Sequence, residues 1–126
     1  METVLLYQIK GTKTAALLKP VLLKLGIRVR IVEPEQYLQS IGFLAGNKAF
    51  AESPEAYDGA GFDEPMMVMA GFSERKLDLF LTEMRRKKMP PIALKAIVTT
   101  QNQAWNSLQL YRELKEEHEK MKSYRK

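Results

Sequence analysis

Polar residues that could bind an anion follow the first apolar segment of the chain. KGTKT, residues 10–14, comes directly after VLLYQI and before a helical pattern of apolar residues. Backbone N–H groups at the start of a helix, with nearby hydroxyl and ammonium groups, can hold a small anion. Lys10, Thr12 and Lys13 are therefore candidate ligand-binding residues. The segment lacks the leading glycine and the length of a phosphate-binding P-loop, so we do not expect nucleotide hydrolysis.

A second polar segment, TTQNQ at residues 99–103, follows the apolar run IALKAIV. Five polar residues exceed what a tight strand-to-helix connection needs, so they form either a contact site or a plain surface loop. Lys95 places a charge inside the preceding apolar run. Its side chain either extends past the sheet edge to water or has a polar partner, such as Glu74 or the 99–103 segment. The complete set of candidate ligand-binding residues is Lys10, Thr12, Lys13, Ser73, Lys95, Thr99, Thr100 and Asn102.

No group of residues predicts catalysis or a metal site. The chain has no cysteine and one histidine, which argues against thiol chemistry, disulfides and zinc or iron centres. Nothing in the spacing of carboxylates such as Glu35, Asp63 and Glu64 places two of them together for acid–base catalysis. GAG at residues 59–61 follows no apolar strand, so it is not a dinucleotide-binding turn. We expect a protein that is not an enzyme and uses no cofactor or metal.

With 126 residues, the chain fits one domain, residues 1–126, with a substantial core. The net charge of +5 is uneven, because residues 49–73 hold five of the 15 acids and no lysine or arginine. The basic remainder is either a solvated surface or a surface that attracts polyanions nonspecifically. The first residues lack signal-peptide features, and no apolar run approaches the ~20 residues of a membrane span. We therefore expect a cytoplasmic protein without membrane association.

The apolar segments that position the candidate residues alternate with helical patterns. The expected strands are residues 4–9, 27–32, 66–70 and 92–98. The first helix should begin after Thr12 and end at Gly26, with Pro20 causing a kink or a non-helical first half. Strand 27–32 alternates apolar residues with Arg28 and Arg30, which predicts an edge position.

Three further helices are expected, with one long interruption between the second and the third. The second follows Pro34, with Tyr37, Leu38, Ile41 and Leu44 on one side, the third begins after Ser73, and the last begins near Ser107. Residues 46–65 are acidic and contain glycines and prolines, which predicts a long surface loop that is partly disordered.

The order βαβα, loop, βαβα divides an α/β domain into two similar halves, about 1–45 and 66–122, joined by acidic loop 46–65. Each βαβ crossover makes its two strands parallel and right-handed. The first and third strands are the most apolar, which favours a mainly parallel sheet of order 2-1-3-4 with helices on both faces. In its all-parallel form, the first and fourth helices cover one face. The alternative is a ferredoxin-like split βαβ sheet of order 4-1-3-2 with two extra helices.

The start of the last helix has a specific capping pattern. With Asn106 as the N-cap, Gln109 occupies the third helical position of a capping box, and Trp105 with Leu110 forms a hydrophobic staple. These rules explain Trp105 without a ligand. The single histidine, His118, lies among acidic residues and is expected to be solvated or partly packed.

The segment from Glu64 to His118 resembles a bacterial family known as a domain of unknown function, the one numbered 3783. The resemblance covers under half of the chain and implies no activity. It draws attention to Lys95, because that charge lies within a matching segment. The matching residues are Gly71, Phe72, Ser73, Leu94, Lys95, Ala96, Thr99, Asn102, Trp105, Glu117 and His118.

The favoured function is a ligand-binding or regulatory module for a small anionic ligand. In an all-parallel 2-1-3-4 sheet, a crevice between the first and third strands would join residues 10–12 with 71–73, and the 99–103 loop would share that rim. The alternative is a self-associating module such as a homodimer, in which the basic surface of one copy meets the acidic loop of another.

Nonspecific nucleic-acid binding is a third hypothesis and is not favoured. The chain contains no recognised nucleic-acid-binding motif, and its basic cluster is not interleaved with aromatic residues. The basic residues concerned are Arg28, Arg30, Arg85, Arg86, Lys87 and Lys88.

Overall fold

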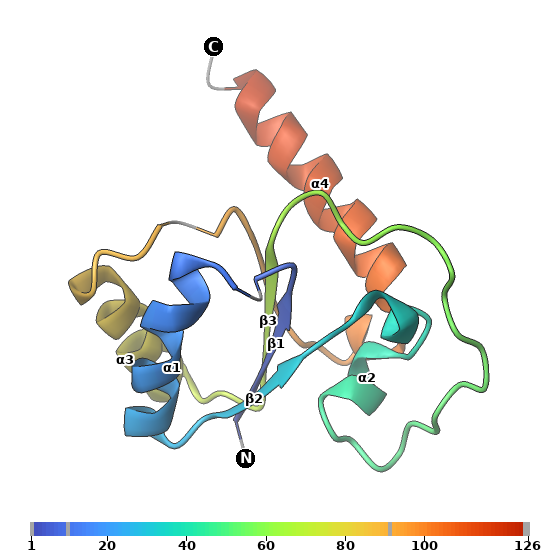
Figure 1. The fold of residues 1–126 in the computed structure, drawn as a ribbon, viewed down its shortest axis with the longest axis horizontal. Helices are drawn as coiled ribbons and strands as arrows, with labels where there is room; N and C mark the ends of the chain where they lie inside the picture. Colours follow the sequence, from blue (N-terminus) through green and yellow to red (C-terminus); the bar gives the residue numbers. More distant parts are fainter. Residues whose placement is uncertain (1, 10, 91, 125–126) are drawn as a thin grey trace.

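The computed structural model describes residues 2–9, 11–90 and 92–124 and shows one four-stranded sheet with helices on both faces (Figure 1). The strands are β1 (Thr3–Tyr7), β2 (Arg28–Ile31), β3 (Met66–Ala70) and β4 (Leu94–Ile97). The α-helices are α1 (Lys13–Leu25), α2 (Ile41–Leu44), α3 (Glu74–Arg86) and α4 (Ser107–Tyr124). Two short 3-10 turns, η1 (Pro34–Gln36) and η2 (Asn102–Ala104), precede α2 and α4.

The sheet has the order β2-β1-β3-β4, which confirms the preferred topology over the ferredoxin-like order. β1 pairs in parallel with β2, and β3 pairs in parallel with β4. Every residue of β1 and β3 is buried, as expected for central strands, whereas every residue of β2 is exposed, as expected for an edge. The sequence pattern therefore predicts both the strand order and the positions of the central strands.

The all-parallel form of the sheet is wrong at its centre, because β1 and β3 are antiparallel. Leu5 lies opposite Val68, and Tyr7, the last residue of β1, lies opposite Met66, the first of β3. β2 also ends beside the end of β1, since Leu6 pairs with Ile31. The chain thus leaves β2 and enters β3 at the same end of the sheet, and no crossover is needed between them.

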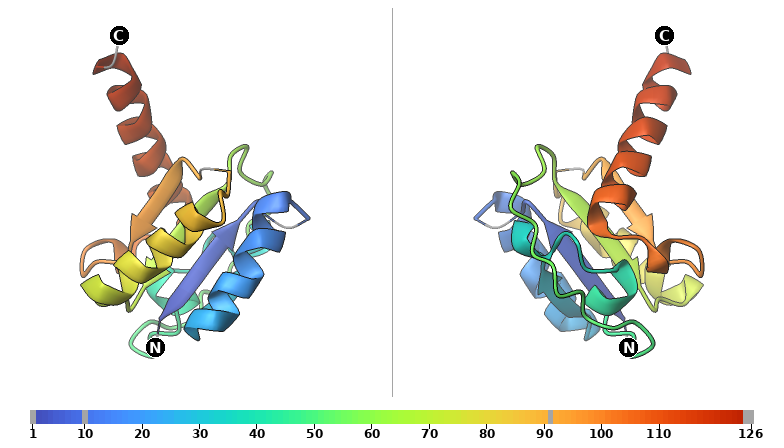
Figure 2. Two further views of the ribbon diagram at one scale, coloured as in Figure 1. Left: turned by 90° about the vertical axis from the view of Figure 1, so that its left-hand side faces the viewer. Right: turned by 90° about the vertical axis from the view of Figure 1, so that its right-hand side faces the viewer.

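This reversal also decides which helices share a face. Both crossovers are expected to be right-handed. Because β1 and β3 are antiparallel, a rotation of 180° about the axis perpendicular to the sheet places the β1–β2 pair onto the β3–β4 pair. Such a rotation does not exchange the two faces of the sheet, so the helices of both crossovers lie on the same face. Figure 2 shows α1 and α3 over one face and α2 with α4 over the other. The expected pairing of the first helix with the fourth is therefore wrong.

Alternate residues of each central strand supply two separate cores. Val4 and Leu6 pack with α1 and α3 in one cluster, whereas Leu5 and Tyr7 pack with α2, α4 and Phe62 in the other. Both layers depend on β1 and β3, so residues of both halves contribute to each core.

The first helix matches its predicted ends but not its predicted interruption. The Thr12 side chain accepts a hydrogen bond from Ala15 N, and Gly26 ends α1 with a φ of 66°. Pro20 lies inside the helix, and residues on both sides of it are helical. The expectation of a non-helical first half is therefore wrong. The second predicted helix is divided into η1 and the single turn of α2.

The linker between the halves has no regular element but is held firmly against the body. Gln39 forms two hydrogen bonds with the backbone of Ser53, at 2.9 and 2.7 Å. Further along, the Phe62 ring stacks on Tyr37 at 4.1 Å and on Tyr111 at 3.9 Å between ring centroids. The predicted long loop is confirmed. In its final part, Phe62 packs between α4 and the η1–α2 segment.

Candidate functional site

The first predicted site lies at the start of α1, where the Thr12 hydroxyl is already used. Its oxygen accepts a hydrogen bond from Ala15 N at 3.2 Å and donates one to Ile9 O. Lys13 is exposed on the first turn, and Lys10 lies outside the described residues. Helix capping therefore accounts for Thr12, and an anion-binding role for these residues stays a prediction.

Ser73 is the corresponding cap of α3, and it lies at the other end of the sheet. Its oxygen accepts a hydrogen bond from Lys76 N at 3.1 Å. Ser73 follows β3, whose last residue, Ala70, lies opposite Thr3 at the start of β1. Because Thr12 follows the end of β1, the two caps are separated by the length of the strands. The expected crevice joining residues 10–12 with 71–73 does not form.

Three side chains of the 99–103 loop, those of Thr99, Asn102 and Gln103, form hydrogen bonds within or next to the loop. Asn102 Oδ1 accepts a hydrogen bond from Thr99 N at 2.8 Å, and Asn102 Nδ2 donates one to Ile97 O at 3.0 Å. Thr99 Oγ1 accepts a hydrogen bond from Asn102 N, and Gln103 Nε2 donates one to Thr100 O. A side chain that bonds the nearby backbone in this way stabilises a turn. The hydrogen bonds thus explain Thr99, Asn102 and Gln103 as residues that stabilise the loop. A binding role for Thr99, Thr100 and Asn102 stays a prediction.

The predicted N-cap is present at the start of α4. Asn106 Oδ1 accepts a hydrogen bond from Gln109 N at 2.9 Å, which confirms the predicted N-cap. Trp105 and Leu110 belong to the same core cluster. The Trp105 carbonyl also accepts a hydrogen bond from Ile41 N at 2.8 Å and so ties this turn to α2.

Of the predicted site residues that the structure describes, Lys95 is the one that lines a sizeable cavity. It is exposed on β4 and points, with Ile97, toward the α3 side of the sheet, because its ladder partner Met67 belongs to that core. Among the described residues it has no ion-pair or hydrogen-bond partner, so neither Glu74 nor the 99–103 loop fills that role.

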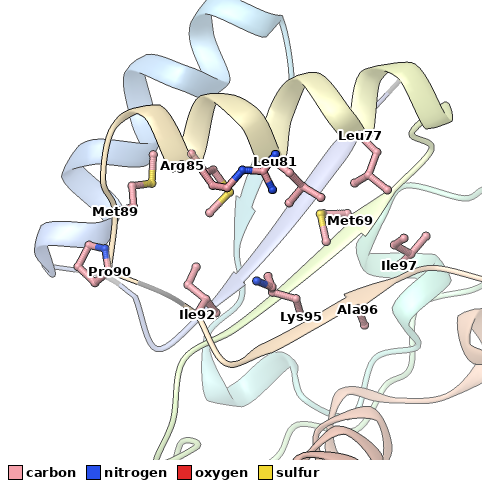
Figure 3. A pocket seen from close by; sticks show the side chains of 11 residues that line it. Met69, Leu77, Leu81, Arg85, Met89, Pro90, Ile92, Lys95, Ala96 and Ile97 are labelled. Atoms are coloured by element: carbon pink, nitrogen blue, oxygen red, sulfur yellow. The ribbon is translucent and has the colours of Figure 1, made fainter.

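The cavity is a groove of about 500 Å³ between α3 and β4, here called the α3–β4 groove (Figure 3). In Figure 3, Arg85 extends from α3 and Lys95 from β4 toward the same space, with apolar side chains around them. The groove is lined by Met69, Leu77, Leu81, Met84, Arg85, Met89, Pro90, Ile92, Lys95, Ala96 and Ile97.

The groove forms because α3 leaves the outer strand partly uncovered. Phe80 anchors α3 and is fully buried, whereas Leu77 and Leu81 are only partly buried at the helix flank. Ile97 remains 47% exposed beside its buried ladder partner Met69. The apolar face of α3 is therefore wider than the part that packs against the sheet, and its uncovered side forms one wall of the groove.

The groove was not predicted from the sequence. Arg85 was considered only as one residue of a basic cluster, and the helical spacing of Leu77, Leu81 and Met84 is typical of a stripe that faces a core. The available signal was that Lys95 and Ile97 alternate with Leu94 on one strand, which places a charge and an apolar residue on the same face.

Tyr7 and Asp63 have shifted pKa values and lie away from the groove. Burial raises the pKa of Tyr7, although its hydroxyl forms a 2.7 Å hydrogen bond with Ser107 Oγ. The Tyr111 hydroxyl donates to Asp63 Oδ1 at 3.0 Å and lowers the pKa of that carboxyl, helped by Lys115. Both contacts join separate elements of the fold, and neither supplies a paired nucleophile and base.

The fold and groove define an α/β domain with a partly apolar cavity beside an edge strand. Residues 65–121 match the family model described as Domain of unknown function (DUF3783), which confirms the resemblance. The matched segment comprises β3, α3, β4 and most of α4, so it contains the whole groove. No curated protein and no solved structure was found to match the chain.

The described residues contain neither a membrane-spanning helix nor a cluster of metal-binding side chains. None of the helices in that part of the chain is sufficiently long and apolar to span a membrane. The described residues also contain no cluster of three or more histidine, cysteine, aspartate or glutamate side chains suited to a metal ion.

Proposed function

We propose that this protein is a non-catalytic binding module that takes a small amphipathic anion in the α3–β4 groove. Such a ligand has an apolar body and an acidic head. The observation that carries the proposal is Lys95, a cation without a carboxylate partner among the described residues, beside an apolar cavity.

The lining suits both parts of such a ligand. Small-molecule sites are typically concave and largely apolar, with a few polar groups that fix orientation, and have volumes of roughly 300–1,000 Å³. The flexible, polarisable side chains of Met69, Met84 and Met89 can adapt to the shape of an apolar body. Lys95 and Arg85 would bind the acidic head, since an ammonium and a guanidinium are good partners for carboxylate or phosphate.

Edge protection is the competing explanation for Lys95. A lysine on an outer strand discourages that strand from pairing with another chain, and this role needs no ligand. It does not require a second cation, however, and Arg85 faces the same cavity from a different element. Ligand binding therefore predicts that both cations contribute to affinity, whereas edge protection predicts that neither does.

The basic residues considered for nucleic-acid binding do not gather on one surface. Arg30 lies over the Phe43 ring on the α2 side of the sheet, whereas Arg85 and Arg86 lie on the last turn of α3. This separation supports the ligand proposal over the nucleic-acid hypothesis. A homodimer stays a prediction that light scattering over a range of protein concentrations would test.

Binding of laurate, a fatty-acid anion, and of the neutral alcohol dodecanol provides the test. Isothermal titration would compare the wild type with Lys95→Met, Arg85→Met and the double variant. Lys87→Met is the matched control, because it removes the same charge from an exposed residue that does not line the groove. Ile97→Trp would add bulk at a partly exposed position on the groove wall and obstruct the groove.

We expect Lys95→Met and Arg85→Met each to weaken laurate binding by about threefold to fivefold, near the upper end for an exposed charge pair. The double variant should lose about tenfold, and Ile97→Trp should abolish the binding of both probes. Dodecanol affinity should not change when a charge is removed. Equal laurate affinity in the wild type and the double charge variant would contradict the proposal.

A further inference from the structure

The outer edge of β2 is open along its whole length. All four of its residues are exposed, with Val29 at 44% and Ile31 at 39%. Arg28 N and Val32 N donate to Glu2 O and Leu6 O, so these alternate amides point toward β1. The N–H and C=O groups of Val29 and Ile31 consequently point away from the sheet. Among the described residues, the outward N–H and C=O groups of Val29 and Ile31 have no backbone hydrogen-bond partner.

The side chains of this edge have opposite chemistry on the two faces. Val29 and Ile31 pair with Val4 and Leu6, which face the α1–α3 layer, and they leave apolar surface exposed there. Arg28 and Arg30 project on the other face. Within the described part of the chain, neither arginine pairs with a carboxylate.

We propose that β2 binds an extended segment of another protein in which acidic residues alternate with apolar ones. Such a segment would add a strand to the sheet, with main-chain hydrogen bonds to Val29 and Ile31. Its acidic side chains would lie beside Arg28 and Arg30, and its apolar side chains beside Val29 and Ile31. Neighbouring side chains on one face are the pairs that stabilise adjacent strands.

A second copy of β2 does not fit this edge. Directly opposed residues of antiparallel strands share a face, so a β2–β2 pair would place arginine opposite arginine, and like charges opposed in this way are destabilising. The acidic linker of another copy also fits poorly. Its carboxylates Glu52, Glu55 and Asp58 recur every third residue rather than every second. A nucleic acid would use the arginines but not the outward backbone amides.

The test uses a fluorescein-labelled peptide with the sequence Gly-Ser-Val-Glu-Val-Glu-Val-Gly-Ser, and fluorescence anisotropy with the full-length chain. A second peptide carries lysine in place of glutamate, and a third is N-methylated at alternate residues so that it cannot pair as a strand. The protein variants are Arg28→Glu/Arg30→Glu and Val29→Pro. The proline removes an outward N–H without removing a bond to β1.

We expect the wild type to bind the glutamate peptide and not the lysine or N-methylated peptide. The double charge variant should lose about tenfold in affinity for the glutamate peptide and gain binding of the lysine peptide. Val29→Pro should weaken binding of the glutamate peptide, and amide exchange at Val29 and Ile31 in the wild type should slow when that peptide binds. The exchange measurement needs no variant, so it stands even where a substitution disturbs folding.

Equal binding of the N-methylated peptide would overturn the proposal, because strand addition requires the main-chain amides. Displacement of the peptide by a single-stranded oligonucleotide at equal concentration would identify a nucleic-acid surface instead and would also overturn it. So would unchanged exchange at Val29 and Ile31 when the peptide is saturating.

Discussion

β2 and β4 have equivalent places in the two halves, since each is the outer strand of a parallel pair and each follows a helix on the same face of the sheet. Their surroundings nevertheless differ. Beside β4, the flank of α3 forms the α3–β4 groove with Lys95 and Arg85. β2 instead presents exposed apolar residues on one face and two arginines on the other. A shared backbone plan therefore positions two different kinds of candidate binding surface.

The largest expected effect comes from removing the Phe62 ring, which packs between the two halves. Phe62 is 9% exposed and stacks between Tyr37 of the first half and Tyr111 of the second. Phe62→Ala should lower the free energy of unfolding by about 3–5 kcal/mol, as large-to-small changes at buried aromatics do. Urea denaturation followed by circular dichroism would measure it. A loss below about 1 kcal/mol would show that the halves hold together without the linker.

A smaller loss is expected from the buried hydrogen bond between Tyr7 and Ser107, which also joins the two halves. Tyr7→Phe and Ser107→Ala should each cost about 1–3 kcal/mol, because each leaves a buried polar partner unpaired. The double variant should cost less than the sum of the two single changes. Strict additivity would mean that the hydroxyl groups do not interact.

The same tyrosine predicts a dependence of stability on pH. Burial raises the pKa of Tyr7, so the folded state favours the neutral phenol. Its contribution to the free energy of unfolding is therefore full below about pH 10, the ordinary tyrosine value, and declines as the pH rises further. The decline measured between pH 9 and 11 should be shallower in Tyr7→Phe. Parallel pH profiles for the two proteins would contradict this assignment.

The two helix caps provide a matched comparison of the halves. Thr12→Ala and Ser73→Ala should each lower the free energy of unfolding by about 1 kcal/mol. Thr12→Ala should have the larger effect, because the Thr12 hydroxyl also donates to Ile9 O. Laurate affinity should be unchanged in both variants. A specific loss of ligand binding in Thr12→Ala would return the site to the start of α1.

The smallest effect concerns the charges on the first turns of the same helices. α1 begins with Lys13, which opposes the helix dipole, whereas α3 begins with Glu74, which complements it. Lys13→Glu should raise the free energy of unfolding by about 0.3–1 kcal/mol, and Glu74→Lys should lower it by a similar amount. Both changes should shrink in high salt. Changes of the same sign in the two helices would contradict this explanation.

Much of the fold follows from local patterns in the sequence. The apolar runs identify β1 and β3 as central strands, and Thr12, Ser73 and Asn106 mark three helix starts. The antiparallel pairing of β1 with β3 could not be predicted in this way. It depends on how the linker returns to the sheet, and its path is fixed by the distant contacts of Phe62 with Tyr37 and Tyr111.

The candidate site was only partly predictable for the same reason. Lys95 is recognisable within one strand, because a charge interrupts an apolar run. Arg85, the second cation that lines the groove, lies on another element, and the two residues share the groove only because α3 packs over β3. In the 99–103 loop, the sequence suggests a ligand-binding site, but Thr99 and Asn102 use their side chains to bond the nearby backbone.

The methyl groups of the methionines offer the most direct test of the central proposal, that the α3–β4 groove binds an amphipathic anion. Met69, Met84 and Met89 line the groove, Met66 belongs to the core on the opposite face, and Met121 lies near the end of α4. Methionine-methyl NMR during a laurate titration should show saturable shifts at the three groove methyls and little change at Met66 and Met121. Unchanged groove methyls at saturating laurate, or shifts confined to Met66 and Met121, would contradict the proposal.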